Sequence, residues 1–395
     1  MNFGVVAEFN PFHNGHKFLI DSLKENGNNT VTAVMSESFV QRGECACLSP
    51  CARTKAALLC GVDLVLSLPV PFATASAKRF AFGGVSVLGA LGCVDALAFG
   101  AENANAENLK KCAEILTSED FSGNLEKYLD QGLSFPVARQ KALEISGGKE
   151  LSDVLLTPNN ILGVEYIKAI NKLDLNMEIF PVGRKGAAHD SSVSVGNICS
   201  ASAIRETLEK GCSVKRFLPE PSYSILREET ENGKAPADYK TLETAILYKL
   251  RSMSAEDLRE LPDVSEGLEY RFLDGIRTSA SLDEILEKVK TKRYTHSRLR
   301  RIVLCALLGV KKEDVLMNAP YIRVLGFNEK GAQLLKTAKE TASLPVITKF
   351  SETEGLDDGA KRVFALECFA RDVFSLALPK ADFCGKEMTD KIVTV

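Results

Sequence analysis

Short apolar runs alternate with stretches of helical periodicity in the first half of the chain. Strands are predicted at FGVVAEF, TVTAVMS, DLVLSLP, DALAFGA and MEIFPVGR, which are residues 3–9, 30–36, 63–69, 95–101 and 177–184. Helices are predicted between the early strands, at residues 16–26, 49–61 and 73–92. Helices that separate short buried strands are typical of βαβ units. The pattern therefore predicts an α/β fold with a Rossmann-like parallel sheet.

Helical periodicity dominates the second half. It follows a polar segment with Pro and Gly at residues 227–241, which we interpret as a linker. Helices are predicted at residues 242–253, 255–261, 267–277, 282–290 and 296–309, and two more strands at 321–327 and 344–350. A chain of 395 residues is long enough for two domains. We predict a catalytic domain at residues 1–226 and a mainly helical domain at residues 227–395.

Composition indicates a globular protein that does not bind polyanions through its overall charge. The net charge is −3, so any basic surface must be local. The start, MNFGVVAEFN, lacks the basic region and cleavage site of a signal peptide. The most apolar window, residues 84–101, contains Asp95 and several glycines, unlike a membrane span. We expect a cytoplasmic protein with no membrane partner, whose eleven cysteines are reduced.

Four cysteines lie close together in the sequence, at Cys45, Cys47, Cys51 and Cys60. Structural zinc sites usually contain two C-x2–4-C pairs separated by a longer loop. The spacing here is C-x-C, then three residues, then eight. It favours small buried apolar residues over a zinc site, and no metal ligand is predicted.

The segment FNPFHNGHKF carries two of the four histidines of the chain, His13 and His16. It follows the first predicted strand and leads into a helix. A helix N-terminus at the carboxyl end of a parallel strand binds anions through its unpaired N–H groups and its dipole. Gly15 leaves room for a phosphate, and the two imidazoles can donate hydrogen bonds to it. The alternative is that both histidines only cap the helix. The chain has no P-loop motif.

HNGH resembles the HxGH motif of the nucleotidylyltransferase superfamily. ICSASAIRE, Ile198 to Glu206, is similar to the late motif of that superfamily, which supports the triphosphate; Ser200, Ser202 and Arg205 are the matching positions. Together with FVQRGE, ARTKAALLCGVDLVLSLP, FGAEN, PNNILGVEY and KRYTHSRLRR, these motifs resemble the tRNA(Met) cytidine acetate ligase family over almost the whole chain. One departure is CACLSPCA after QRGE, where the family has Pro-Ala and a Trp.

The resemblance implies that ATP and acetate form acetyl-adenylate and pyrophosphate, and that the acetyl group then passes to N4 of the wobble cytidine of elongator tRNA(Met). His13 and His16 would stabilise charge at the α-phosphate, and Lys17 or Arg205 would neutralise the pyrophosphate. Magnesium is expected from triphosphate chemistry, although no carboxylate pair is evident to hold it. The implied ATP contacts are Val6, Ala7, Glu8, Phe9, Asn10, Pro11, Phe12, His13, Asn14, Gly15, His16, Lys17, Phe18, Leu19, Gly100, Asn159, Arg184, Ser200 and Ser202.

Several of these residues have simpler interpretations. Asn159 can act as the N-cap of the following helix. Arg184 can be a solvated loop charge. Gln41 and Arg42 are candidates to cover the active site. His189 and Asp190 can form a catalytic dyad, although a surface loop is the preferred interpretation.

The segment from Lys288 to Arg301 contains seven Lys and Arg residues and no acidic residue. Such a local basic patch is typical of contact with a nucleic-acid backbone, and a solvated helix face is the alternative. With the family resemblance, the partner expected is tRNA and not DNA. Aromatic side chains within the patch can stack on unpaired bases. The predicted tRNA-binding residues are Lys290, Lys292, Arg293, Tyr294, His296, Arg298, Arg300 and Arg301.

Two other functions use the same motifs. A small-molecule adenylyltransferase of the pantetheine-phosphate or nicotinamide-mononucleotide kind shares HxGH and the late Ser/Arg motif. It leaves the long C-terminal half with its basic segment unexplained. An RNA-binding protein with an inactive nucleotidyltransferase domain is the third candidate, and the intact His13, Gly15, His16 and Arg205 argue against it.

Overall fold

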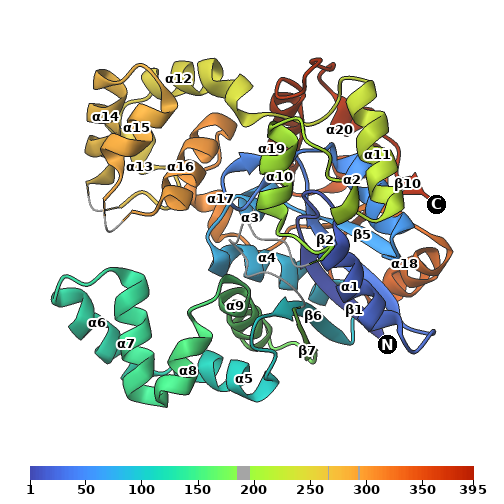
Figure 1. Ribbon diagram of the computed structural model, residues 1–395, viewed down its shortest axis with the longest axis horizontal. Coiled ribbons are helices and arrows are strands. Elements are labelled where there is room, and N and C mark those ends of the chain that lie inside the picture. The colour runs from blue at the N-terminus through green and yellow to red at the C-terminus, as the bar shows by residue number, and fades with distance from the viewer. Residues whose placement is uncertain (185–195, 266, 292–293) are drawn as a thin grey trace.

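A central sheet of eight strands organises the computed structural model, which describes residues 1–184, 196–265, 267–291 and 294–395 (Figure 1). Its order is β10-β8-β5-β2-β1-β6-β7, and β9 pairs with β8. Five neighbouring strands run parallel: β5 (Leu64–Leu68), β2 (Thr30–Ser36), β1 (Asn2–Ala7), β6 (Ala96–Ala101) and β7 (Glu178–Gly183). These five strands coincide with the predicted apolar runs, so the predicted α/β class is confirmed.

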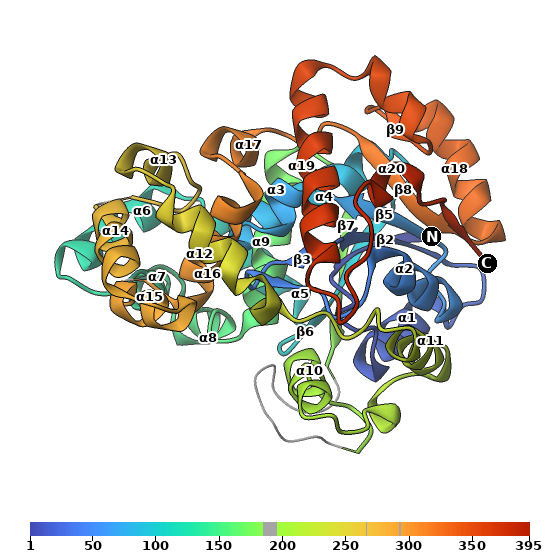
Figure 2. The ribbon, with the colours of Figure 1, turned by 90° about the horizontal axis from the view of Figure 1, so that it is seen from above.

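Helices cover both faces of the sheet (Figure 2). One face packs on α1 (Asn14–Lys24), α2 (Pro50–Leu59), α10 (Ala201–Glu209) and α11 (Glu220–Glu231). The other packs on α4 (Ala77–Ala90), α9 (Pro158–Lys172) and α18 (Glu329–Thr341). Alternating side chains of β2 follow this division, because Ala33 and Met35 join the first core and Val34 joins the second.

Two groups of helices project from the same side of the molecule (Figures 1 and 2). The first lies between β6 and α9 and contains α5 (Ala106–Ile115), α6 (Glu119–Asp130), α7 (Phe135–Gly147) and α8 (Lys149–Val154). The second contains α12 (Glu243–Arg251), α13 (Ala255–Arg259), α14 (Leu268–Thr278), α15 (Leu282–Val289), α16 (His296–Leu308) and α17 (Lys312–Leu316). Its apolar core also takes in residues of α3 (Val70–Ala73) and α19 (Asp358–Ser375).

After α17 the chain returns to the first sheet. Strand β8 (Ile322–Phe327) pairs antiparallel with β5, and β10 (Val393–Thr394) pairs with β8. The short β9 (Val346–Ile347) pairs in parallel with the start of β8, at Ile322 and Arg323. Helix α20 (Lys386–Thr389) precedes β10. The boundary between residues 226 and 227 stays a prediction. The linker interpretation is wrong for the start of residues 227–241, because α11 continues to Glu231. This helix is anchored by the buried side chains of Ile225 and Leu226.

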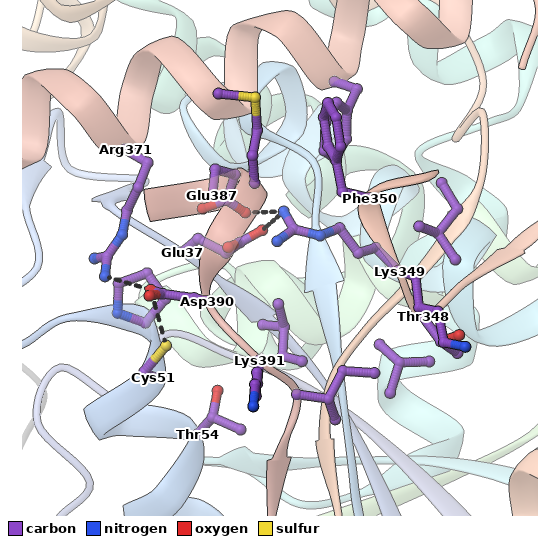
Figure 3. A pocket seen from close by; sticks show the side chains of 18 residues that line it. Glu37, Cys51, Thr54, Thr348, Lys349, Phe350, Arg371, Glu387, Asp390 and Lys391 are labelled. Atoms are coloured by element: carbon purple, nitrogen blue, oxygen red, sulfur yellow. Dashed lines mark hydrogen bonds and ion pairs between the residues drawn. The ribbon is translucent and has the colours of Figure 1, made fainter. Parts of the chain in front are cut away.

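A buried ionic cluster joins this returning segment to the end of β2. Nη1 of Arg323 in β8 lies 3.4 Å from Oε1 of Glu37 and 3.3 Å from Oε2 of Glu367, and it also pairs with Glu387. Figure 3 shows Glu37 and Glu387 pointing toward the same position. Burial, followed by the charge of Glu37, raises the pKa of Glu367 to about 8 and that of Glu387 to about 7.

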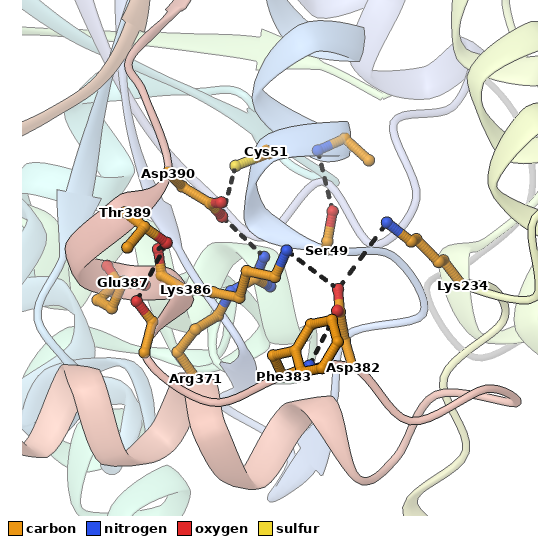
Figure 4. A network of polar contacts seen from close by, with 12 residues as sticks. Ser49, Cys51, Lys234, Arg371, Asp382, Phe383, Lys386, Glu387, Thr389 and Asp390 are labelled. Atoms are coloured by element: carbon orange, nitrogen blue, oxygen red, sulfur yellow. Dashed lines mark hydrogen bonds and ion pairs between the residues drawn. The ribbon is translucent and has the colours of Figure 1, made fainter.

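A second polar network holds the C-terminal tail (Figure 4). The carboxylate of Asp390 lies 3.2 Å from Nη2 of Arg371 and accepts a hydrogen bond from the thiol of Cys51 at 3.4 Å. Asp382 lies 3.5 Å from Nζ of Lys386 and 3.8 Å from Nζ of Lys234. The tail is thereby attached to α2, α19 and the loop after α11, which keeps β10 beside β8.

Replacing Glu387 by glutamine is expected to flatten the pH dependence of stability. Glu367 and Glu387 titrate above the ordinary glutamate value in the folded protein, so between about pH 4.5 and 8 the folded state keeps protons that the unfolded state has released. The free energy of unfolding therefore falls as pH rises through this window. Glu387→Gln removes one buried charge while keeping an acceptor for Arg323, and should recover on the order of a few kcal/mol at about pH 8.

Urea unfolding followed by circular dichroism at about pH 5 and pH 8 measures this effect. Glu340→Gln makes the same chemical change at an exposed position of α18 and should leave the slope unchanged. A Glu387→Gln variant that is less stable than the parent at pH 8 would contradict the expectation, since the ion pair with Arg323 would then outweigh the repulsion.

Candidate active site

The loop between β1 and α1 fixes both histidines of HNGH. His13 is the N-cap of α1, and its Nδ1 accepts the N–H of Gly15 at 3.0 Å. Nδ1 of His16 accepts the N–H of His13 at 3.2 Å, which completes a capping box. The two rings stack with their centres 3.8 Å apart. Both histidines therefore cap α1, and since both Nδ1 atoms are acceptors, each ring carries its hydrogen on Nε2.

His16 is held in its neutral form. Burial lowers its pKa well below the usual value, and the electrostatic effects of His13 and Arg184 lower it further. Its ring packs against Phe9 and Phe12, with ring centres 5.1 and 5.5 Å away. A neutral imidazole with hydrogen on Nε2 is a hydrogen-bond donor and not a cation at physiological pH.

Gly15 is required by the histidine beside it. A β-carbon at this position would lie 2.8 Å from Cε1 of His13, closer than non-bonded carbon atoms approach. The sequence suggested that the glycine admits a phosphate. The geometry adds a second reason, because the missing side chain lets the His13 ring reach the backbone N–H that it caps.

A cleft of about 830 Å³ opens at the carboxyl ends of β1, β6 and β7. Most of the predicted ATP contacts line it: Val6, Ala7, Glu8, Phe9, Asn10, His13, Gly15, His16, Phe18, Leu19, Gly100, Asn159, Arg184, Ser200 and Ser202. Arg205, Gln41 and Arg42 line it as well. Strand ends of a parallel sheet are where such folds bind ligands, so the topology explains why residues far apart in sequence meet here.

Four predicted residues do not line the cleft. Pro11 and Phe12 are buried beneath the loop. The side-chain amide of Asn14 donates to the backbone oxygens of Asn197 at 2.8 Å and Arg216 at 3.0 Å, so it ties the HNGH turn to the segments that flank α10. Lys17 pairs with Asp21 one turn along α1, on the outer face of that helix.

Arg205 of the late motif ICSASAIRE contacts the loop that carries HNGH. Nη1 of Arg205 donates to the backbone oxygen of Asn10 at 2.9 Å, and Nη2 approaches Oγ of Ser202 at 3.5 Å. Ser200 is the N-cap of α10, since its Oγ accepts the N–H of Ala203 at 3.2 Å. Because Ser200 and Ser202 line the cleft at this helix start, the cleft meets the N-terminal ends of both α1 and α10.

The positions taken from FGAEN, PNNILG and VGRKG also come together. Thr157, and not Asn159, is the N-cap of α9, so the capping interpretation of Asn159 is wrong. The amide of Asn159 instead donates to Oε1 of Glu102 at 2.6 Å. The side chain of Arg184 is exposed and lines the cleft, and a β-carbon at Gly100 would lie 3.4 Å from its Cγ.

Sequence reasoning missed Arg53, which is fully buried behind the site. Its guanidinium donates to the backbone oxygens of Glu8 at 2.6 Å, Ser36 at 2.8 Å and Leu48 at 3.1 Å, and also to that of Glu37. The carbonyls of Glu8, Ser36 and Glu37 lie where β1 and β2 end, and that of Leu48 lies just before α2. An arginine inside the apolar helical pattern ARTKAALL was the available signal, because a buried charge requires many partners.

The apolar wall of the cleft was also missed. It is formed by Phe80, Phe99 and Tyr166, with Ile161 and Leu162 beside them. Burial raises the pKa of Tyr166, so this phenol stays protonated. These residues lie within ordinary helix and strand patterns, which mark them as core positions and do not distinguish a cleft wall from a core.

The loop after β2 connects the cleft to the second group of helices. Backbone N–H groups of Gln41 and Cys47 donate to Oε1 of Glu8 at 2.9 Å and to Oδ1 of Asn10 at 2.7 Å. β3 (Phe39–Val40) and β4 (Glu44–Cys45) form a hairpin, and Gln41 lies in the turn that joins them. Gly43 turns this hairpin with φ of 78°, and a β-carbon there would lie 2.6 Å from the carbonyl carbon of Arg300. The hairpin therefore packs directly on the backbone of α16.

The predicted basic patch is largely engaged in contacts within the protein. Arg298 donates to the backbone oxygen of Asp263 at 2.7 Å, and Arg301 lies 3.1 Å from the Asp263 carboxylate. Arg300 pairs with Glu44, whose other oxygen lies 4.0 Å from Arg205. Arg301 lines the cleft as well. The patch is thus linked to the cleft through the hairpin.

The remaining residues of the patch differ in exposure. Tyr294 is only 5% exposed, so the expectation that its ring stacks on unpaired bases conflicts with its burial. Nε2 of His296 lies 3.2 Å from Glu287, and Nζ of Lys290 lies 3.8 Å from the same carboxylate. Lys292, Arg293, His189 and Asp190 lie outside the described residues.

In the part of the chain that the structure describes, no group of three or more His, Cys, Asp or Glu side chains is placed to hold a metal ion. Burial raises the pKa of Cys47 and Cys60 to about 11 and that of Cys51 to about 12, which keeps these thiols protonated. None of the described helices has both the length and the apolar character needed to span a bilayer.

Sequence comparison finds proteins that are similar along nearly the whole chain. The family model described as HIGH Nucleotidyl Transferase matches residues 1–388. A tRNA(Met) cytidine acetate ligase of Halothermothrix orenii is 41% identical over 363 residues, covering 87% of this chain and 86% of the relative. The protein of the same name from Caldanaerobacter subterraneus is 39% identical over 393 residues, covering 96% and 97%.

Solved structures are similar to the same extent. The crystal structure of Thermotoga maritima TmcAL in its apo form matches with a TM-score of 0.95 and 35% identity, covering 100% of this chain and 99% of that one. The same protein bound with alpha-thio ATP matches with a TM-score of 0.93 at 35% identity and the same coverage. The similarity therefore includes both groups of projecting helices and the returning C-terminal strands.

Proposed function

Because the chain belongs to the HIGH nucleotidyl transferase family and, within it, to the tRNA(Met) cytidine acetate ligases, we propose that it activates acetate with ATP and acetylates a tRNA cytidine. A carboxylate oxygen of acetate attacks the α-phosphorus of ATP, and pyrophosphate leaves. The N4 amine of the wobble cytidine of elongator tRNA(Met) then attacks the acyl carbon, and AMP leaves. The proposed location is the cytoplasm, where tRNA and ATP are present.

One observation carries the first step: two motifs some 190 residues apart in sequence meet in a single cleft, joined by the 2.9 Å hydrogen bond from Arg205 to the backbone oxygen of Asn10. In attack at the α-phosphorus, negative charge grows on the phosphate oxygens. His13 and His16 carry hydrogen on Nε2, in rings fixed by backbone hydrogen bonds. Fixed donors need no reorganisation as that charge develops, which is the main source of electrostatic catalysis.

The remaining groups of the cleft have roles that follow from their position. Arg205 and the start of α10 support the departing pyrophosphate. Arg184, Gly100 and Asn159 line the part of the cleft formed by β6, β7 and α9, and we assign them to ATP. The apolar wall of Phe80, Phe99 and Tyr166 excludes water, which would otherwise hydrolyse the acetyl-adenylate.

Lys17 and magnesium would both act on the departing pyrophosphate. Lys17 would leave Asp21 to reach it. Glu8 is the one carboxylate among the described cleft-lining residues, and it already accepts the N–H of Gln41. Magnesium binds triphosphates with few protein ligands and several waters, so a Mg²⁺ ion would be held by the phosphate oxygens of ATP.

The second step requires an RNA surface beside the cleft. We assign it to the basic patch: Lys290, His296, Arg298, Arg300 and Arg301, together with Lys292 and Arg293. The support is the attachment of α16 to the active-site hairpin, through Gly43 and through the ion pair of Arg300 with Glu44. Once the adenylate has formed, orienting the amine supplies much of the rate, since a mixed anhydride is already reactive.

The proposal is tested by incubating the protein with ATP, labelled acetate and unmodified tRNA. Digested tRNA is then examined for acetylcytidine by mass spectrometry of nucleosides. Labelled acetylcytidine that depends on ATP is the expected result. Transfer of AMP to a phosphorylated small molecule without acetate would instead identify an adenylyltransferase, and tRNA binding without turnover would contradict an enzymatic role.

A further inference from the structure

An exposed aromatic residue stands at the mouth of the cleft. Phe135 is the first residue of α7, its side chain is 53% exposed, and it lines the cleft with its neighbour Pro136. Single exposed aromatic residues are common on protein surfaces, but this one lines the same cleft as His13 and His16. The role assigned to the cleft so far does not involve α7.

The ring of Phe135 is held in a defined position. Helix α7 is anchored by buried residues on its inner face, Ala138, Ala142 and Leu143. The guanidinium of Arg139, one turn further along, lies 5.8 Å from the centre of the Phe135 ring. This cation–π contact favours the observed position of the ring, and an exposed aromatic face can stack against a nucleobase.

The opposite wall of the mouth belongs to α16. Thr295, Ser297 and Arg301 line the same cleft as Phe135 and as the two histidines. The two helix groups that carry these walls project from the same side of the molecule (Figure 1). A segment that enters between them reaches the catalytic histidines without leaving the cleft.

The charge of the residues that line the cleft indicates which kind of polymer segment can bind there. The described lining residues include four arginines and one carboxylate, Glu8. The arginines are Arg42, Arg184, Arg205 and Arg301. A cationic channel with an exposed aromatic platform is the combination by which proteins bind single-stranded nucleic acid. A duplex presents no unstacked base for such a platform, so the chemistry favours an RNA loop.

We infer that Phe135 is the platform on which an unpaired base of the substrate RNA loop stacks as the acceptor cytidine enters between α7 and α16. This inference rests on the proposed function and extends it to a specific residue on the helical insertion between β6 and α9. Stacking there orients the loop so that the N4 amine points toward the acyl carbon of the adenylate. Selectivity for unpaired over duplex RNA follows from the same contact.

The test compares Phe135→Ala with Ile145→Ala in the full-length protein. Ile145 lies on the same helix and is 60% exposed, but it does not line the cleft. Base–aromatic stacking contributes a factor of roughly 5 to 150 per base. Phe135→Ala should therefore raise the KM for unmodified tRNA by about tenfold or more. The rate of acetate-dependent exchange of pyrophosphate into ATP should change far less. Phe135→Tyr should restore the KM, and Ile145→Ala should match the parent.

Equal KM values for Phe135→Ala and Ile145→Ala would overturn the inference. A loss of exchange in Phe135→Ala as large as its loss of tRNA acetylation would also overturn it, because the ring would then serve the nucleotide site. Binding of a labelled anticodon stem-loop to the same variants, measured by fluorescence anisotropy, decides the role of Phe135 independently. A parent protein without acetate-dependent exchange would refute the proposed function, and the binding comparison would still stand.

Discussion

Replacing His16 by alanine is expected to lower the acetate-dependent exchange of pyrophosphate into ATP by about 10²–10³-fold, the usual cost of removing one fixed donor to a developing oxyanion. The donor is Nε2, because Nδ1 already accepts the N–H of His13 at 3.2 Å. tRNA binding should survive, since His16 is not part of the basic patch, whose residues His296, Arg298, Arg300 and Arg301 belong to α16. Pyrophosphate exchange measures the first step alone and separates it from acetyl transfer.

A matched variant separates catalysis from folding. In His16→Asn the amide oxygen can take the place of Nδ1 and keep the capping box of α1, while the donor at Nε2 is lost. Similar losses of exchange in His16→Asn and His16→Ala, with unchanged unfolding transitions, would assign the effect to the donor. Full exchange activity in His16→Asn would remove His16 from the catalytic step.

The lowered pKa of His16 adds a pH expectation. Burial and the electrostatic effects of His13 and Arg184 all lower the pKa of His16 and so disfavour its imidazolium form. Exchange should therefore show no titration of this residue between about pH 6 and 8. Because the unfolded chain takes up a proton at the ordinary histidine pKa, this group contributes stability that is lost as pH falls below about 6.5.

Of the five parallel strands, β7 at the sheet edge is partly exposed, whereas β5, β2, β1 and β6 were predictable because they are largely buried on both faces. Such strands read as continuous apolar runs, and TVTAVMS or DLVLSLP could not be surface segments. The strand at residues 321–327, whose burial alternates along β8, was also predicted, but its pairing with β5 was not. An apolar pattern indicates that a strand is buried, and it does not indicate which strand lies beside it.

The active site likewise has parts that could be predicted from the sequence and parts that could not. HNGH and ICSASAIR are local signals, because a cap and a helix start require particular residue types at fixed spacing. Contacts between distant segments left no such signal. The packing of Gly43 on the backbone of Arg300 and the burial of Tyr294 depend on how the second group of helices, α12 to α17, packs against the β3–β4 hairpin and within itself. Phe135 resembles any residue of a polar helix until the cleft is known.

Replacing Arg53 by methionine is expected to destabilise the protein by about 3–5 kcal/mol, the usual consequence of removing one member of a buried charged network. The guanidinium is fully buried, and it is the donor for the backbone oxygens of Glu8, Ser36, Glu37 and Leu48. Methionine fills much of the volume but leaves these carbonyls without that donor, at about 1–3 kcal/mol for a buried polar group. Burial lowers the pKa of Arg53 to about 10, so it remains charged at neutral pH.

Lys55→Met provides the control, because it removes an exposed cation two residues along the same helix and should change stability by no more than about 0.5 kcal/mol. Urea unfolding of the two variants measures the difference. Equal stabilities would mean that water or a rearranged loop replaces the guanidinium. Since the carbonyls of Glu8 and Ser36 lie at the ends of β1 and β2, Arg53→Met molecules that remain folded should also bind ATP more weakly. This residue would then connect the stability of the sheet to the shape of the cleft.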